Sequence, residues 1–292
     1  MSSPQDLKNL CAEKEFFIGI DSDGCVFDSM EPKHKECFCP AFINNFNLQS
    51  VSKYARDVWD FVNLYSQDRG CNRFHAVIKA LDLLRERPEV KKRGARIMEM
   101  PALKAWTERE SKLGNPALKI EIEKTNDPEL KIAYQWSLDV NEAVKKIIRG
   151  VPPFPLFQES LDKMRQNADV IVVSQTPAEA LIREWTELGI DKKVRFIAGQ
   201  EIGTKAEHLE FAAKGKYPQN KILMIGDAPG DLKAASCAGA LFYPIIPGKE
   251  DDSWKRFHDE ALNKFFTMSY EGSYQNDLFF EFNKSLPEKA PW

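Results

Sequence analysis

Short apolar runs with strand character alternate with amphipathic helical segments in this chain, first briefly near the start and then regularly beyond residue 150. Strands that alternate with helices form parallel sheets through right-handed crossovers. The sequence therefore predicts an α/β core. The predicted strands are 16–20, 170–173, 194–198, 222–225 and 241–246, and the predicted helices are 156–166, 176–189, 204–213 and 232–238.

Between these two parts, residues 29–150 show helical spacing of apolar residues and no strong strand signal. The predicted helices there are 51–65, 74–84, 101–113 and 130–148, the last with a start signal at 127–129. We therefore predict a core from 1–28 and 151–250 that carries a helical insertion, 29–150. Residues 251–292 are helical in character and rich in aromatics. They are predicted to pack on the core as an extension, and a subunit contact is the alternative.

Composition narrows the class of protein further. The chain has 292 residues, 43% of them hydrophobic, and a formal net charge of −3. This balance gives no reason to expect a nucleic-acid partner, and no run has the length of a membrane helix. The first residues lack the apolar stretch of a secretory signal. Six cysteines without paired spacing suggest reduced thiols, so we expect a cytoplasmic protein.

Candidate chemistry lies where the first strand stops. Asp21 and Asp23 follow it directly, and Gly24 allows a sharp turn beside whatever is bound. In open parallel sheets, ligands bind at this carboxyl end of the strands. Two neighbouring carboxylates favour a divalent cation between them, and oxygen ligands suit Mg²⁺. The alternative is an ordinary polar turn.

Further polar residues end or adjoin other predicted strands. Ser174 ends the second strand, Asp227 and Asp231 follow the fourth, and Lys205 begins the helix before it. A carboxylate can attack phosphorus, while a hydroxyl and an ammonium hold the phosphate oxygens and offset their charge. Further carboxylates can hold Mg²⁺ against the same group. Together these residues predict a phosphate site.

This order of motifs resembles the haloacid dehalogenase (HAD) superfamily, in the phosphoglycolate phosphatase-like and β-phosphoglucomutase-like subgroup that carries a helical, C1-type cap. The resemblance covers residues 14–28 and 151–248 well, the insertion only in its position and helical character, and the C-terminal residues not at all. It implies a Rossmann-like parallel sheet core with an inserted α-helical cap. The motifs in chain order are Asp21-Ser-Asp23-Gly-Cys25, Ser174, Lys205, and Gly226-Asp227 through Asp231.

The resemblance implies an Mg²⁺-dependent phosphatase that hydrolyses a small phosphate monoester. Asp21 is then the nucleophile that forms an aspartyl-phosphate, and Asp23 is the general acid and base. The metal is held by the Asp21 carboxylate, the Asp23 main-chain oxygen and Asp227, with Asp231 as a further ligand or as a group that orients its waters. The implied phosphate-binding residues are Ser174, Gln175 and Lys205, of which Lys205 also orients the acids.

Several alternatives stay open at this point. A β-phosphoglucomutase-like phosphotransferase uses the same core, and a non-catalytic binding protein could use the same fold. A haloacid dehalogenase or a phosphonate hydrolase fits less well, because the second acid, Asp23, is present. The expected partner is a small phosphorylated metabolite that the cap selects, and the chain is expected to be a monomer or a homodimer.

Other residues admit two interpretations each. Cys25 stands where the family usually has Thr or Val, and it either fills that apolar slot or serves as an exposed redox-sensitive thiol. Arg69, Asn72 and Arg73 either form a solvated loop or contact a second charged group of the substrate. The three tryptophans of the insertion are expected in its core rather than on a stacking surface; they are Trp59, Trp106 and Trp136.

Overall fold

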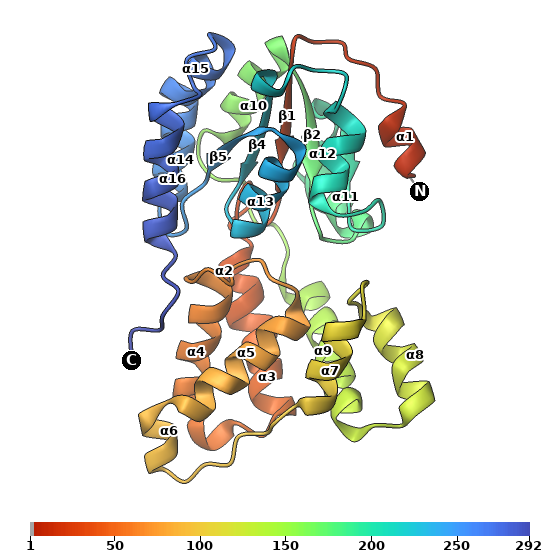
Figure 1. Ribbon diagram of the computed structural model, residues 1–292, viewed down its shortest axis with the longest axis vertical. Helices are drawn as coiled ribbons and strands as arrows, with labels where there is room; N and C mark the ends of the chain where they lie inside the picture. Colours follow the sequence, from red (N-terminus) through yellow and green to blue (C-terminus); the bar gives the residue numbers. More distant parts are fainter. Residues whose placement is uncertain (1–2) are drawn as a thin grey trace. The chain divides into compact units, whose positions relative to one another are not determined.

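A five-stranded parallel sheet forms the centre of one part of the computed structural model, which describes residues 3–292 (Figure 1). The strand order is β3-β2-β1-β4-β5, so β1 lies in the middle. In this register Ile20 of β1 is level with Val172 of β2 and Ile225 of β4, which brings the carboxyl ends of all three to one edge. The strands are β1 Phe16–Ile20, β2 Ala168–Val173, β3 Phe196–Ala198, β4 Ile222–Gly226 and β5 Leu241–Pro244. The predicted α/β fold with a Rossmann-like core is confirmed.

Side chains alternate between the two faces of the sheet, and both faces are buried. Ile18 and Tyr243 lie in one hydrophobic cluster and Phe17 and Phe242 in the other. The first face is covered by α10 Phe157–Asn167 and α11 Ala178–Glu187, and the second by α12 Lys205–Ala213, α13 Pro229–Ala238 and α1 Pro4–Lys8.

The chain divides into two compact units. The first holds the sheet and consists of Met1–Ser29 and Gly150–Leu286, and the second consists of Met30–Arg149 and Pro287–Trp292. The second unit is helical and has its own core, in which Trp59, Trp106 and Trp136 are fully buried; this confirms their expected place. Its main helices are α2 Met30–Pro32, α3 Cys39–Asn45, α4 Ser52–Leu64, α5 Arg73–Glu86, α6 Pro88–Lys92, α7 Pro101–Arg109, α8 Asn115–Thr125 and α9 Pro128–Ile147.

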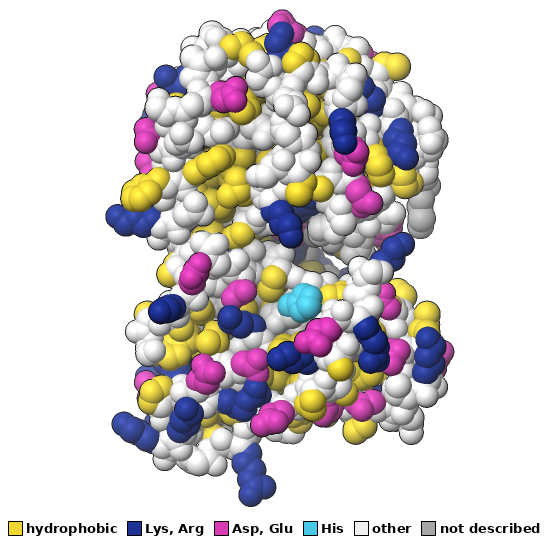
Figure 2. All heavy atoms as spheres, viewed as in Figure 1, with side chains coloured by type: hydrophobic (Ala, Val, Ile, Leu, Met, Phe, Trp, Pro, Cys, Tyr) yellow, Lys and Arg dark blue, Asp and Glu magenta, His cyan; other side chains and the backbone are white. Residues whose placement is uncertain are grey.

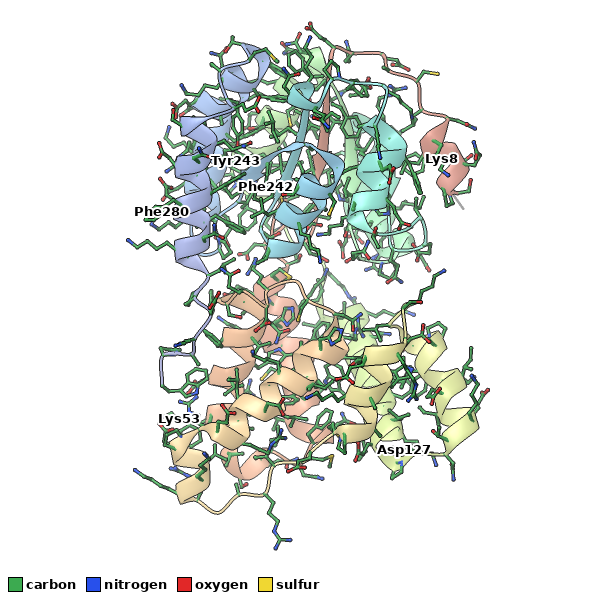
Figure 3. All side chains as sticks on the ribbon, in the orientation of Figure 1. Lys8, Lys53, Asp127, Phe242, Tyr243 and Phe280 are labelled. Atoms are coloured by element: carbon green, nitrogen blue, oxygen red, sulfur yellow. The ribbon has the colours of Figure 1, made fainter. Side chains whose placement is uncertain are left out.

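C-terminal helices α14 Glu250–Arg256, α15 Leu262–Phe266 and α16 Ser273–Ser285 lie beside the edge strand β5 (Figure 1). Tyr243 packs against Phe257, with ring centroids 4.9 Å apart, and Phe242 packs against Phe282 at 5.7 Å. Figure 3 labels this neighbouring pair on β5 and also Phe280, which points outward from α16. The extension thus contributes to both hydrophobic clusters of the sheet.

The structure differs from the sequence expectations in several elements. The helix predicted over 176–189 begins at Ala178, after Pro177 and without a side-chain cap, and the Thr176 hydroxyl donates to the Asp23 carboxylate instead. Helices α1, α2, α3, α6 and α8 lie outside the predicted helices. The extension 251–292 was expected on the core, yet its last residues, Pro287–Trp292, belong to the helical unit.

Within residues 3–292, no helix combines the length and the apolar character that crossing a bilayer requires. On the face seen in Figure 2, basic and acidic side chains are interspersed rather than gathered by sign.

Candidate active site

Asp21 lies at the carboxyl end of the central strand. Its backbone N–H donates to the carbonyl of Ile225 in β4, at 2.9 Å, which extends the sheet pairing to the first residue beyond β1. Its side chain is buried. The Ser22 backbone N–H donates to Oδ1 at 2.8 Å, and the Lys205 ammonium donates to Oδ2 at 2.7 Å. Each oxygen of this carboxylate therefore has a positioned donor.

Lys205 is brought to Asp21 by a well-capped helix. It is the first residue of α12, and Thr204 and Glu207 form a reciprocal capping box there. Its ammonium also donates to Oδ1 of Asp231 at 2.6 Å. Oδ2 of Asp231 accepts the N–H of Ala228 at 3.1 Å, at the start of α13. Both oxygens of Asp231 are thus engaged, and one of them helps to fix Lys205.

Three carboxylates meet at this edge of the sheet: Asp21, Asp227 and Asp231 are all buried, and one oxygen of each lies within 4.8 Å of the others. Burial raises the pKa of Asp21 to about 7, with Lys205 lowering it and Asp231 raising it. Burial likewise raises the pKa of Asp231. Burial acts to lower the pKa of Lys205, but its two carboxylate partners outweigh this effect and raise it.

This donor set fits a hard divalent cation. When all three acids are ionised, three negative charges lie close together in a buried place beside the Lys205 ammonium, and a cation bound among them would offset their mutual repulsion. An oxygen-only cluster of carboxylates is the chemistry that Mg²⁺ prefers. Asp21 and Asp227 are the predicted side-chain ligands in this cluster.

Asp23 is held apart from that cluster by two hydroxyl groups. The Ser29 hydroxyl donates to Oδ1 at 2.5 Å, and the Thr176 hydroxyl donates to Oδ2 at 2.8 Å. Sequence reasoning did not assign either residue to the site. The available signal was the Thr176 hydroxyl, two positions after Ser174, but this residue was interpreted only as the start of the predicted helix 176–189.

Ser174 and Gln175 follow β2, beside β1. Ser174 is buried, and its hydroxyl oxygen accepts the Thr176 N–H at 3.1 Å. The Gln175 side chain is exposed, and its amide donates to the carbonyl of Gly203 at 2.9 Å. The structure thus places both residues at the expected edge of the sheet, with Gln175 linked to the loop that leads into α12.

Cys25 is fully buried, and this burial raises the pKa of its thiol well above the ordinary value. An exposed, redox-sensitive thiol is therefore wrong, because a thiolate forms readily only in an accessible or electropositive place. The apolar slot is the correct interpretation.

Two arginines of the helical unit, Arg69 and Arg73, bind neighbouring groups of that unit. Arg69 is buried and donates to the Leu64 carbonyl at 2.9 Å. Arg73 donates to the Ser137 hydroxyl at 2.9 Å and to Asn141 at 2.8 Å. Arg69 therefore ties the turn after α4 to the end of that helix, and Arg73 joins α5 to α9, so the solvated-loop interpretation is wrong for these two side chains.

The fold and the clustered acids define an α/β enzyme with an acidic site at the carboxyl edge of its sheet. A sequence model of the haloacid dehalogenase-like hydrolases matches residues 96–244, just over half of the chain. The chain belongs to this family of hydrolases, as its motifs suggested. The match includes Ser174, Lys205, Asp227 and Asp231, while Asp21 and Asp23 precede it.

Solved structures similar to this chain come from several bacteria. A predicted phosphoglycolate phosphatase from Haemophilus somnus is 16% identical, with a TM-score of 0.44, covering 80% of this chain and 86% of that one. A predicted phosphatase from Clostridium acetobutylicum is 13% identical, with a TM-score of 0.45, covering 86% of this chain and all of that one. A haloacid dehalogenase-like hydrolase from Streptococcus pneumoniae is 13% identical, with a TM-score of 0.42, covering 84% and 91%. No curated protein matches the chain.

Proposed function

We propose that this hydrolase is an Mg²⁺-dependent phosphatase that hydrolyses a small phosphate monoester through an aspartyl-phosphate on Asp21. One observation carries the proposal. The Asp21 carboxylate stands at the end of the central strand, bonded to the Lys205 ammonium and next to two further buried acids. A nucleophile, a cation for the phosphate oxygens and a donor set for a metal thus meet at one point.

In the first step, one oxygen of Asp21 attacks phosphorus and the bond from phosphorus to the ester oxygen breaks. Asp23 gives its proton to the leaving oxygen and becomes a carboxylate. In the second step, Asp23 takes a proton from water, the resulting hydroxide oxygen bonds to phosphorus, and the bond from Asp21 to phosphorus breaks. Inorganic phosphate leaves, and both side chains return to their starting states.

The remaining residues bind and offset charge. Lys205, Ser174 and Gln175 hold the non-bridging oxygens of the phosphoryl group. Bound Mg²⁺, held by Asp21, the Asp23 main-chain oxygen and Asp227, supplies further compensation for the negative charge on these oxygens. Asp231 keeps Lys205 in place and supports the metal or its waters. We further infer that the helical unit, Met30–Arg149, is the cap that selects the substrate.

The Asp21→Asn variant tests the scheme, because an amide oxygen cannot form the acyl phosphate. With p-nitrophenyl phosphate and Mg²⁺, we expect this variant to lose at least about 1,000-fold in kcat. We expect EDTA to abolish turnover by the native enzyme and added Mg²⁺ to restore it. Release of inorganic phosphate, measured directly, distinguishes hydrolysis from transfer to a sugar phosphate.

Asp28→Asn is the matched control, since Asp28 lies on the same loop and is exposed. We expect it to keep the native kcat. Turnover retained by Asp21→Asn, or a similar loss in both variants, would contradict the assignment of Asp21 as nucleophile.

A further inference from the structure

Two buried tryptophans contact the short loop that carries Asp21 and Asp23. The indole N–H of Trp185 donates to the Ser22 hydroxyl oxygen at 3.0 Å, and that of Trp254 donates to the Cys25 carbonyl at 2.8 Å. Both tryptophans are fully buried. Two indole N–H groups therefore hold the loop, one before and one after Asp23, in addition to the Phe154 N–H, which donates to the Val26 carbonyl at 2.8 Å.

Most other backbone bonds of this loop are made within it. The N–H groups of Val26 and Phe27 donate to the Ser22 carbonyl, at 2.9 and 3.1 Å, and the Gly24 N–H donates to Phe27 at 2.9 Å. Gly24 has a φ of 73°, which a residue with a side chain adopts only rarely. The result is a tight turn from which the Cys25 carbonyl points outward, toward Trp254.

Trp254 comes from α14, in the C-terminal segment that follows the matched region of the family. Its ring packs edge-on against Phe157, with centroids 5.0 Å apart, and against Phe257 at 5.5 Å. Phe157 in turn contacts Trp185 at 5.9 Å. Rigid rings with edge-to-face contacts leave the indole little freedom, so its N–H is a fixed point for the loop.

We propose that Trp254 is a positioning residue of the active-site loop, so that the C-terminal extension is part of the catalytic apparatus. This inference rests on the proposed function of Asp21 and Asp23. Without the indole donor, the buried carbonyl of Cys25 lacks this partner, and buried carbonyls are rarely left so. The turn then shifts toward another donor and carries Asp23, two residues away, out of position for proton transfer.

Trp254→Phe removes the N–H and keeps an aromatic ring in the same space. With p-nitrophenyl phosphate and Mg²⁺, we expect kcat to fall about 10-fold, since displacements of about 1 Å can cost this much or more. We expect KM to stay within about twofold of the native value, because the phosphate-binding side chains come from other elements. Circular dichroism checks that the variant is folded at the assay temperature.

Trp136→Phe is the matched control. Trp136 is also fully buried among aromatic rings, in the helical unit, but its indole nitrogen has no hydrogen-bond partner among the described residues. Loss of a buried indole in itself should thus leave kcat per folded molecule unchanged. A native kcat in folded Trp254→Phe would overturn the proposal, as would an equal loss in both variants.

A second replacement covers the case in which Trp254→Phe does not fold. Site-specific incorporation of β-(3-benzothienyl)alanine at residue 254 keeps the two-ring shape and replaces only the N–H by sulfur. We expect the same fall in kcat, and a native kcat here overturns the proposal.

Hydrogen–deuterium exchange gives a readout that does not depend on turnover. We expect faster exchange of the amides at 22–27 in the Trp254 variants and native exchange there in Trp136→Phe. Unchanged exchange at 22–27 overturns the proposed positioning role of Trp254, even if Asp21→Asn is inactive. If exchange at 22–27 is faster in the Trp254 variants but Asp21→Asn still turns over substrate, the proposed function is contradicted and the positioning role of Trp254 is not.

Discussion

At the scale of single residues, the site depends on Gly226, which leaves room for the side chain of Asp231. Gly226 ends β4, and a Cβ atom built on it would overlap the Cβ and Cγ atoms of Asp231. These atoms are close to the backbone of α13 and cannot swing away as the end of a long side chain can. Because Asp231 holds the Lys205 ammonium, the absence of one side chain at Gly226 helps to set the position of the lysine.

We expect Gly226→Ala to push Asp231 aside, to lower the free energy of unfolding by about 1–3 kcal/mol, and to lower kcat with p-nitrophenyl phosphate. Gly230→Ala is the nearby control, in the first turn of α13, since a Cβ at that position meets nothing within 4 Å. Its stability and kcat should be native or slightly higher. Urea unfolding and steady-state kinetics check both variants, and a native Gly226→Ala enzyme would contradict the steric argument.

At the scale of secondary-structure elements, the ends of helices and strands position the side chains of the site. The first turn of α12 combines Lys205, which the proposed mechanism uses, with the capping box of Thr204 and Glu207. The Glu207 carboxylate accepts the Thr204 N–H at 2.7 Å, and the Thr204 hydroxyl accepts the Glu207 N–H at 3.2 Å. The cap therefore fixes the direction in which the first residue of the helix leaves the loop.

Thr204→Ala should cost about 1 kcal/mol of stability and should also loosen Lys205. We expect KM for p-nitrophenyl phosphate to rise about threefold, as when roughly 0.7 kcal/mol of side-chain ordering has to be supplied on binding. Ser3→Ala is the control, because Ser3 and Asp6 form the same kind of capping box in α1. Urea unfolding and KM are measured for both variants. A rise of KM in Ser3→Ala, or no rise in Thr204→Ala, would contradict the claim that the Thr204 cap orders Lys205.

Element by element, the sequence predicts the core better than the insertion. Strand β1 has the predicted bounds, because five apolar residues stop at a charged one. Helix α8 was missed, because Ile120 and Ile122 alternate with charged residues as in a strand. In the structure Leu118 and Ile122 face the helical core while Ile120 is exposed, a spacing that becomes visible only once the packing partner is known.

The sequence likewise predicts only part of the candidate site. Residues that end apolar runs, such as Asp21 and Asp227, carry a local signal, and the structure brings them together. Ser29 and Trp254 carry no such signal, and Thr176 carries only its place two positions after Ser174, because each of them bonds a residue that lies elsewhere in the sequence. Long-range hydrogen bonds of this kind leave no periodic pattern in the sequence.

The whole molecule has two separately packed units, and its C-terminal residues pass from one to the other. Trp292 belongs to the helical unit, where its ring meets Phe61 edge-on at 5.5 Å and lies 4.5 Å from the guanidinium of Arg87. Arg87 is buried and also bonds Asp57 at 2.9 Å. The last residues of the chain thus cover the buried guanidinium of Arg87, which joins α4 to the start of α6.

Removing that cover tests whether the two units are stabilised independently. We expect Trp292→Ala to remove about 1–2 kcal/mol of aromatic and cation–π contact and to speed hydrogen exchange in α4, α5 and α6. Exchange in β1 to β5 should stay native, because the cores of the two units are separate clusters. Phe280→Ala is the control, since this ring is 71% exposed on α16, and it should change neither unit. Faster exchange in the sheet of Trp292→Ala would mean that the C-terminal residues stabilise the catalytic core as well, and the two units would then unfold as one.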